Sequence, residues 1–73
     1  MTNNIYSKEY KQVTEKLRSA RLASGFTQET VAEKLGKPQS YVSKSEAGER
    51  RLDVTELKKF AELYKKDINY FVE

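Results

Sequence analysis

The 73-residue sequence contains no cysteine and no histidine. Without cysteine, the chain can form no disulfide bond, no thiolate zinc site and no cysteine nucleophile. Without histidine, it lacks the side chain that most often transfers protons and binds metals at neutral pH. These absences argue against an enzyme, and we expect no catalytic residue, no metal, no other cofactor and no small-molecule ligand.

Long apolar stretches are missing as well. No apolar run approaches the roughly 18 residues of a membrane-spanning helix. The first residues, MTNNIYSKEYK, lack the apolar segment of a signal peptide. We therefore expect a cytoplasmic protein that does not contact membranes. The length predicts a single domain over residues 1–73, with modest stability when it is alone.

The charge balance is weakly informative. The sequence has 14 basic and 11 acidic residues, which give a net charge of +3. Such a charge is compatible with a polyanionic partner, but many soluble domains share it. The positions of the charges therefore matter more than their sum.

Helix-breaking residues are few, and they divide the chain into short helical segments. Proline occurs once and glycine three times, at Gly25, Gly36, Pro38 and Gly48. The first segment carries an apolar stripe with spacings of four, three, four and three, which is typical of one helix face. Its members are Tyr6, Tyr10, Val13, Leu17 and Ala20. We expect this helix to end near Gly25 and to pack on its own domain, because the repeat is too short for a coiled coil.

The next two segments are also predicted as helices. One begins after Thr27, a good N-cap residue, and ends at Gly36. The other begins with Pro38 as its first helical residue and ends at Gly48. The inward positions of these two helices are expected to be Val31, Ala32, Leu35 and Val42.

A capping box, Asp53 to Glu56, predicts the start of a fourth helix. Its apolar positions are Val54, Leu57, Phe60, Ala61 and Tyr64. A final short helical segment is expected over Ile68–Val72. Because no strand pattern is present, the sequence predicts a compact all-α domain of five short helices.

Residues 28–47 have the layout of a helix-turn-helix motif, in which two short helices flank a turn that begins at glycine. Such a motif needs a small residue where the helices cross, a turn residue free to take positive φ, and an apolar residue in the second helix. Ala32, Gly36 and Val42 fill these positions at the expected spacing.

The stretch RSARLASGFTQETVAEKLGKPQSYVSKSEAGERRLDVTEL resembles the Cro/C1-type (Xre-like) helix-turn-helix family, which includes the phage lambda and 434 repressors. The resemblance extends from about Lys16 to Phe71. Its most specific parts are Gly25–Glu29, the run QSYVSK and Glu46–Leu52. It implies a lambda-repressor-like fold, with a second helix and a recognition helix that bind double-stranded DNA sequence-specifically.

One stripe of the third helix is predicted to read bases. With 3.6 residues per turn, it lies opposite Val42 and Ser45, and the chain carries no acidic residue between Lys34 and Glu46. Amide, hydroxyl and ammonium groups of this kind hydrogen-bond to base edges in the major groove. The predicted base-reading residues are Gln39, Ser40, Ser43 and Lys44.

The resemblance implies further contacts with the phosphate backbone. Gln28 would meet it at the N-terminus of the second helix, where anions are favoured. Lys37, Arg50 and Arg51 flank the recognition helix and are expected to contact phosphates. Tyr41 is left open between a backbone contact and a cover for the turn.

The resemblance also implies an ion pair between Arg21 and Glu46 that fixes the recognition helix against the domain. The sequence departs from the family at Ser45, where family members usually carry a large apolar residue. We therefore expect polar contacts to replace part of the packing there.

The last segment predicts a homodimer on an inverted-repeat operator. Ile68 and Phe71 are expected to complete the core, whereas Tyr70 and Val72 would lie outward in the dimer interface. A phage or plasmid repressor and a controller protein of a restriction-modification system fit equally. The alternative is an antitoxin or protein-interaction module with the same fold, which a pull-down of a co-encoded partner would distinguish.

Overall fold

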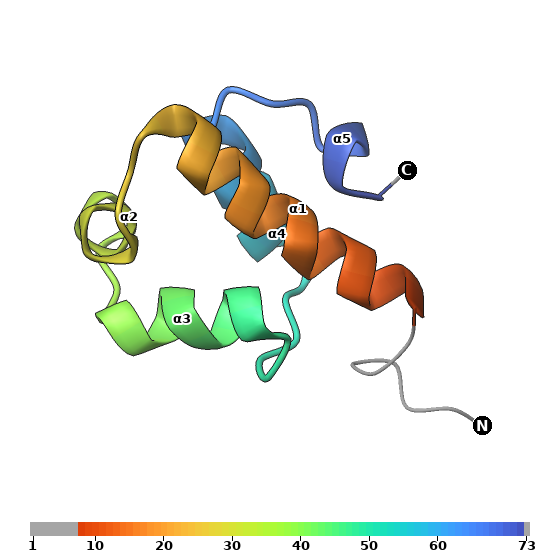
Figure 1. The fold of residues 1–73 in the computed structure, drawn as a ribbon, viewed down its shortest axis with the longest axis horizontal. Coiled ribbons are helices and arrows are strands. Elements are labelled where there is room, and N and C mark those ends of the chain that lie inside the picture. The colour runs from red at the N-terminus through yellow and green to blue at the C-terminus, as the bar shows by residue number, and fades with distance from the viewer. Residues whose placement is uncertain (1–7, 73) are drawn as a thin grey trace.

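The computed structural model describes residues 8–72, which form five helices and no strand. The predicted all-α fold is therefore confirmed, whereas Tyr6 lies outside the described residues. Figure 1 shows the helices, which are α1 (Lys8–Ser24), α2 (Gln28–Leu35), α3 (Gln39–Ala47), α4 (Val54–Leu63) and α5 (Asn69–Val72).

The core lies where the five helices meet, and each helix contributes a large side chain that is almost completely buried. These side chains are Leu17, Val31, Val42, Phe60 and Phe71. In Figure 1, α1 runs diagonally across the molecule, and it packs on both α3 and α5. Since burial of apolar area is the main favourable contribution to folding, this shared cluster fixes the positions of α2 and α3.

The helix ends follow from local sequence. The Thr27 hydroxyl accepts a hydrogen bond from the Thr30 amide at 3.0 Å, which caps α2. Gly36, with φ of 69°, ends α2 in the left-handed conformation that glycine adopts without strain. Asp53 and Glu56 form the predicted capping box of α4.

Two details differ from the prediction. Pro38 is the N-cap of α3 and not its first helical residue, because its backbone is extended with ψ of 157° and its carbonyl accepts the first helical hydrogen bond, from the Tyr41 amide. Val54 is 71% exposed, because it lies in the first turn of α4, before the buried stripe that begins at Leu57. Within residues 8–72, no helix is both long and apolar enough to cross a membrane.

Candidate nucleic-acid interface

The helices α2 and α3 pack against each other across a tight turn. The Lys37 amide donates to the Ala32 carbonyl at 2.9 Å, so the chain reverses direction immediately after Gly36. Ala32 and Val42 are both buried, as the helix-turn-helix motif requires. One face of α3 therefore packs inward, and its opposite face is presented to solvent.

The outward face of α3 is polar and carries no carboxylate. Its members Gln39, Ser40, Ser43 and Lys44 are all exposed. The acidic residue of this helix, Glu46, has its side chain only 3% exposed. The exposed surface thus combines an amide, two hydroxyl groups and an ammonium group, which are suited to hydrogen bonds with base edges.

Ser45 is completely buried on the inward face of α3. Its hydroxyl donates to the Tyr41 carbonyl one turn earlier, at 2.7 Å. This bond satisfies the buried hydroxyl, which would otherwise be costly to desolvate. A polar contact within the helix therefore occupies the position at which a larger apolar side chain would pack.

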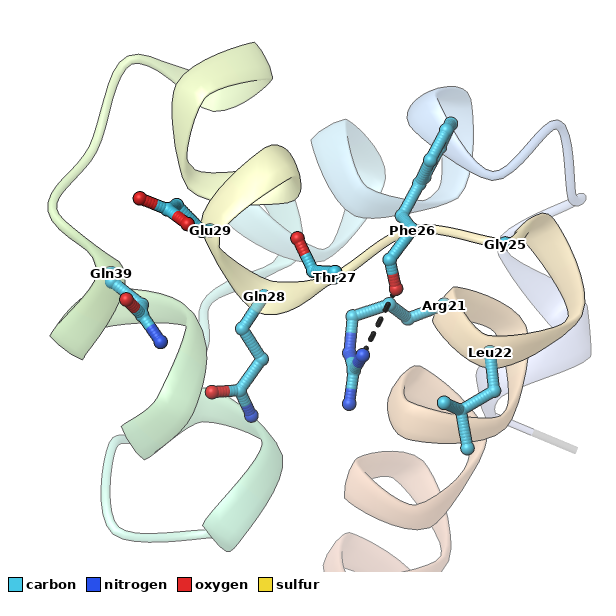
Figure 2. Close-up of a pocket in the computed structure, with 8 residues that line it drawn as sticks. All are labelled: Arg21, Leu22, Gly25, Phe26, Thr27, Gln28, Glu29 and Gln39. Carbon is cyan, nitrogen blue, oxygen red and sulfur yellow. Dashed lines mark hydrogen bonds between the residues drawn. The ribbon is translucent and has the colours of Figure 1, made fainter.

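Arg21 and Glu46 join α1 to α3 through a two-pronged ion pair. Arg21 Nε lies 2.7 Å from Glu46 Oε2, and Nη2 lies 3.1 Å from Oε1. Nη1 donates to the Phe26 carbonyl at 3.0 Å, as Figure 2 shows. The hydrogen bond to Glu46 raises the pKa of Arg21. Burial raises the pKa of Tyr64, and the negative charge of Glu46 raises it further.

The same carboxylate also orients Gln28, whose Nε2 donates to Glu46 Oε1 at 3.1 Å. Gln28 and Gln39 line a shallow groove at the N-terminus of α2. In Figure 2 the side chains of Gln28, Gln39 and Arg21 extend toward the same side, whereas Phe26 points the opposite way. The groove therefore presents two amides beside the start of the recognition helix.

The loop between α3 and α4 carries Arg50, whose guanidinium already has two partners. It forms an ion pair with Glu56, and its Cζ lies 4.5 Å from the centroid of the Tyr41 ring. Tyr41 is half-buried and stacks on Phe60, with a centroid separation of 6.1 Å. Burial raises the pKa of Tyr41. The Tyr41 ring thus lies between Phe60 of the core and the Arg50 guanidinium. The ammonium of Lys37 lies 5.3 Å from the centroid of the same ring.

Tyr10 fixes this loop to α1. Its hydroxyl donates to the Arg50 carbonyl at 2.8 Å and accepts from the Leu52 amide at 2.9 Å. Arg51 is exposed, with its Cζ 5.9 Å from the centroid of the Tyr10 ring. The sequence indicated only that Tyr10 belongs to an apolar stripe, because nothing local reveals a hydroxyl bond to a segment 40 residues away.

At the other end of the molecule, α5 packs on α1. Phe71 is buried, and Tyr70 is half-buried, with its ring perpendicular to that of Phe71 at a centroid distance of 4.9 Å. The ammonium groups of Lys16 and Lys66 lie 5.6 and 4.7 Å from the Tyr70 centroid. Val72 is 56% exposed. Tyr70 therefore lies less outward than predicted, and Val72 is the more accessible of the two.

No group of three or more Asp or Glu side chains in residues 8–72 is arranged to hold a metal ion. A family model described as helix-turn-helix matches residues 17–71. A search of curated proteins and a search of solved structures give no significant match.

Proposed function

Since the chain belongs to the Cro/C1-type helix-turn-helix family of DNA-binding transcription regulators, we propose that it binds a specific inverted-repeat operator as a homodimer. The observation that carries this proposal is the outward face of α3. Four exposed polar side chains without a carboxylate lie on a helix whose inward face is fixed by the core and by the ion pair between Arg21 and Glu46.

In the proposed complex, α3 enters the major groove. Its 9 residues make a helix about 13 Å long. The diameter of an α-helix with its side chains is about 10–12 Å, which matches a major groove about 12 Å wide. Gln39 pairs with adenine and Lys44 donates to guanine, as their functional groups favour. Ser40 and Ser43, whose side chains are shorter, add hydrogen bonds on the same face.

Phosphate contacts flank the base-reading face. Gln28 lies at the N-terminus of α2, where the helix dipole favours an anion. Lys37 precedes α3, and Arg50 and Arg51 follow it in the loop. Of the two arginines, Arg51 is more accessible to a phosphate, because Arg50 is paired with Glu56 and stacked on Tyr41.

The test begins with selection of a preferred duplex from random DNA, followed by fluorescence anisotropy. We expect Gln39→Ala to weaken binding to the selected site by about 1–3 kcal/mol and binding to random DNA by less. Gln12→Ala, at an exposed glutamine of α1, is the matched control and should leave both affinities unchanged. Equal affinity of the unmodified protein for selected and random DNA would contradict sequence-specific recognition.

A further inference from the structure

We propose that the DNA-binding surface extends onto α1, where Arg18 contacts a backbone phosphate. This inference rests on the proposed function. Arg18 is exposed and lines a shallow surface groove with Gln28, Ser43, Glu46 and Ala47. Two of these neighbours, Gln28 and Ser43, are proposed DNA contacts from α2 and α3. A duplex that touches both of them passes directly over the groove.

No carboxylate in this groove neutralises the positive charge of Arg18. The carboxylate of Glu46 is already bonded to Arg21 through both oxygens, and it also accepts from Gln28. Within residues 8–72, Arg18 itself forms no ion pair. The groove therefore has a net positive charge at its rim, and the charged residue on its floor is neutralised.

The chemistry of arginine suits a phosphate at this place. Its planar guanidinium presents several N–H donors, which match two phosphate oxygens at once. The long side chain crosses the gap between the surface of α1 and a backbone that lies along α3. A lysine would supply the charge but not the paired geometry.

A second basic residue of α1 provides a natural comparison. Lys16 lies two positions before Arg18, and two residues correspond to about 200° around a helix, so the two side chains leave α1 on opposite sides. The Lys16 ammonium accordingly lies 5.6 Å from the Tyr70 ring centroid, on the α5 side of the molecule. Replacement of either residue by glutamine removes one charge from the same helix, but only Arg18 borders α3.

The experiment compares Arg18→Gln, Arg18→Lys and Lys16→Gln with the unmodified protein. Affinities for the selected duplex and for random DNA are measured from about 50 to 200 mM KCl, the range over which phosphate contacts weaken strongly. Each phosphate contact adds about 0.9 to the slope of log affinity against log salt concentration. Arg18→Gln should remove one such increment for each bound subunit, and therefore about two for each dimer, on both DNAs. Arg18→Lys should retain them, and Lys16→Gln should leave the slope unchanged. Circular dichroism verifies that all variants are folded at the temperature used.

Phosphate ethylation interference gives an independent readout. We expect one phosphate per half-site at which ethylation impairs binding of the unmodified protein but not of Arg18→Gln. An unchanged slope and interference pattern for Arg18→Gln would overturn the contact while DNA binding itself stands. An equal loss of slope in Lys16→Gln would also overturn it, because the effect would then follow net charge and not position. Failure of the unmodified protein to bind any DNA would overturn both this inference and the proposed function.

Discussion

Glu46 connects the stability of the domain to its proposed binding surface. Its two carboxylate oxygens accept from Arg21 Nε and Nη2 and from Gln28 Nε2. One side chain of α3 thereby fixes the end of α1 and orients an amide at the start of α2. The carboxylate is nearly inaccessible to solvent, so the ion pair is a desolvated one whose partners depend on each other.

We expect Glu46→Ala to lower the free energy of unfolding by about 3–5 kcal/mol, because the Arg21 guanidinium would be left unpaired in a buried site. That is a large part of the roughly 5–15 kcal/mol available to a small domain. Urea denaturation followed by circular dichroism measures the change. Glu49→Ala, at an exposed position in the following loop, is the matched control and should alter stability by less than about 0.5 kcal/mol.

The double variant Arg21→Met/Glu46→Leu separates the cost of a stranded charge from the contribution of the pair. Replacement of both partners by apolar residues is often neutral or stabilising. The double variant should therefore recover most of the stability lost in Glu46→Ala, but it should bind DNA more weakly because Gln28 loses its partner. A Glu46→Ala protein as stable as the unmodified one would show that the pair does not fix α3.

At the scale of single residues, the sequence predicts contacts between near neighbours better than contacts between residues that are far apart in the chain. The juxtaposition of Arg21 and Glu46 followed from the family resemblance, since no local pattern links residues 25 positions apart. Arg50 was expected to face the DNA backbone, and the structure places its guanidinium against Glu56 and Tyr41. The capping role of Glu56 was evident from its spacing to Asp53, but its second partner depends on how the loop folds back.

At the scale of elements, the α3–α4 loop is the segment in which the fold and the proposed backbone contacts meet most closely. Tyr10 binds the loop at two points, the Arg50 carbonyl and the Leu52 amide. The exposed Arg51 lies between them in the sequence. The direction in which Arg51 projects therefore depends on a hydroxyl group of α1.

We expect Tyr10→Phe to release this loop. Loss of the hydroxyl leaves the Leu52 amide without its partner, which should cost about 1–3 kcal/mol of stability. Amide hydrogen exchange at Leu52 should accelerate, and the salt dependence of DNA binding should fall by up to about one phosphate contact for each bound subunit as Arg51 becomes mobile. A merely structural role for Tyr10 would change the stability but leave the salt slope as it is.

Arg51→Ala and Tyr70→Phe complete this test. If Tyr10 acts through Arg51, then Arg51→Ala should flatten the salt slope in the unmodified protein but cause no further change in Tyr10→Phe. Tyr70→Phe is the matched control, because it also removes one tyrosine hydroxyl group, but from α5. It should leave the Leu52 exchange rate unaltered. An additive effect of Tyr10→Phe and Arg51→Ala on the slope would contradict the proposed positioning.

The helices themselves were largely predictable, because their ends are encoded locally. Thr27, Gly36, Gly48 and the capping box of α4 each satisfy or terminate backbone hydrogen bonds through a near neighbour. The packing of helices against one another was not local information. The approach of Arg18 to α3 and the exposure of Val54 both depend on where α1 and α4 cross their neighbours, which periodicity alone does not specify.

For the whole molecule, the proposed recognition of an inverted repeat requires two copies of α3 about 34 Å apart, which one chain cannot supply. The candidate contact is α5, whose outer surface carries the exposed Val72 beside the half-buried Tyr70. Lys16 and Lys66 cover part of the Tyr70 ring. The apolar contact would therefore centre on Val72 and not on the Tyr70 ring.

We expect Val72→Asp to raise the dimer dissociation constant at least about tenfold, which corresponds to about 1.4 kcal/mol, because a carboxylate would be desolvated at the centre of the contact. Sedimentation equilibrium without DNA measures the change. Val54→Asp is the matched control, because Val54 is 71% exposed at the start of α4, where an acidic residue is compatible with the helix dipole. It should leave both the dimer and the helical circular-dichroism signal intact. On operator DNA, Val72→Asp should protect one half-site at concentrations at which the unmodified protein protects both. A Val72→Asp protein that dimerises normally would place the interface elsewhere, and an unmodified protein that remains monomeric with a single protected half-site would refute the dimer.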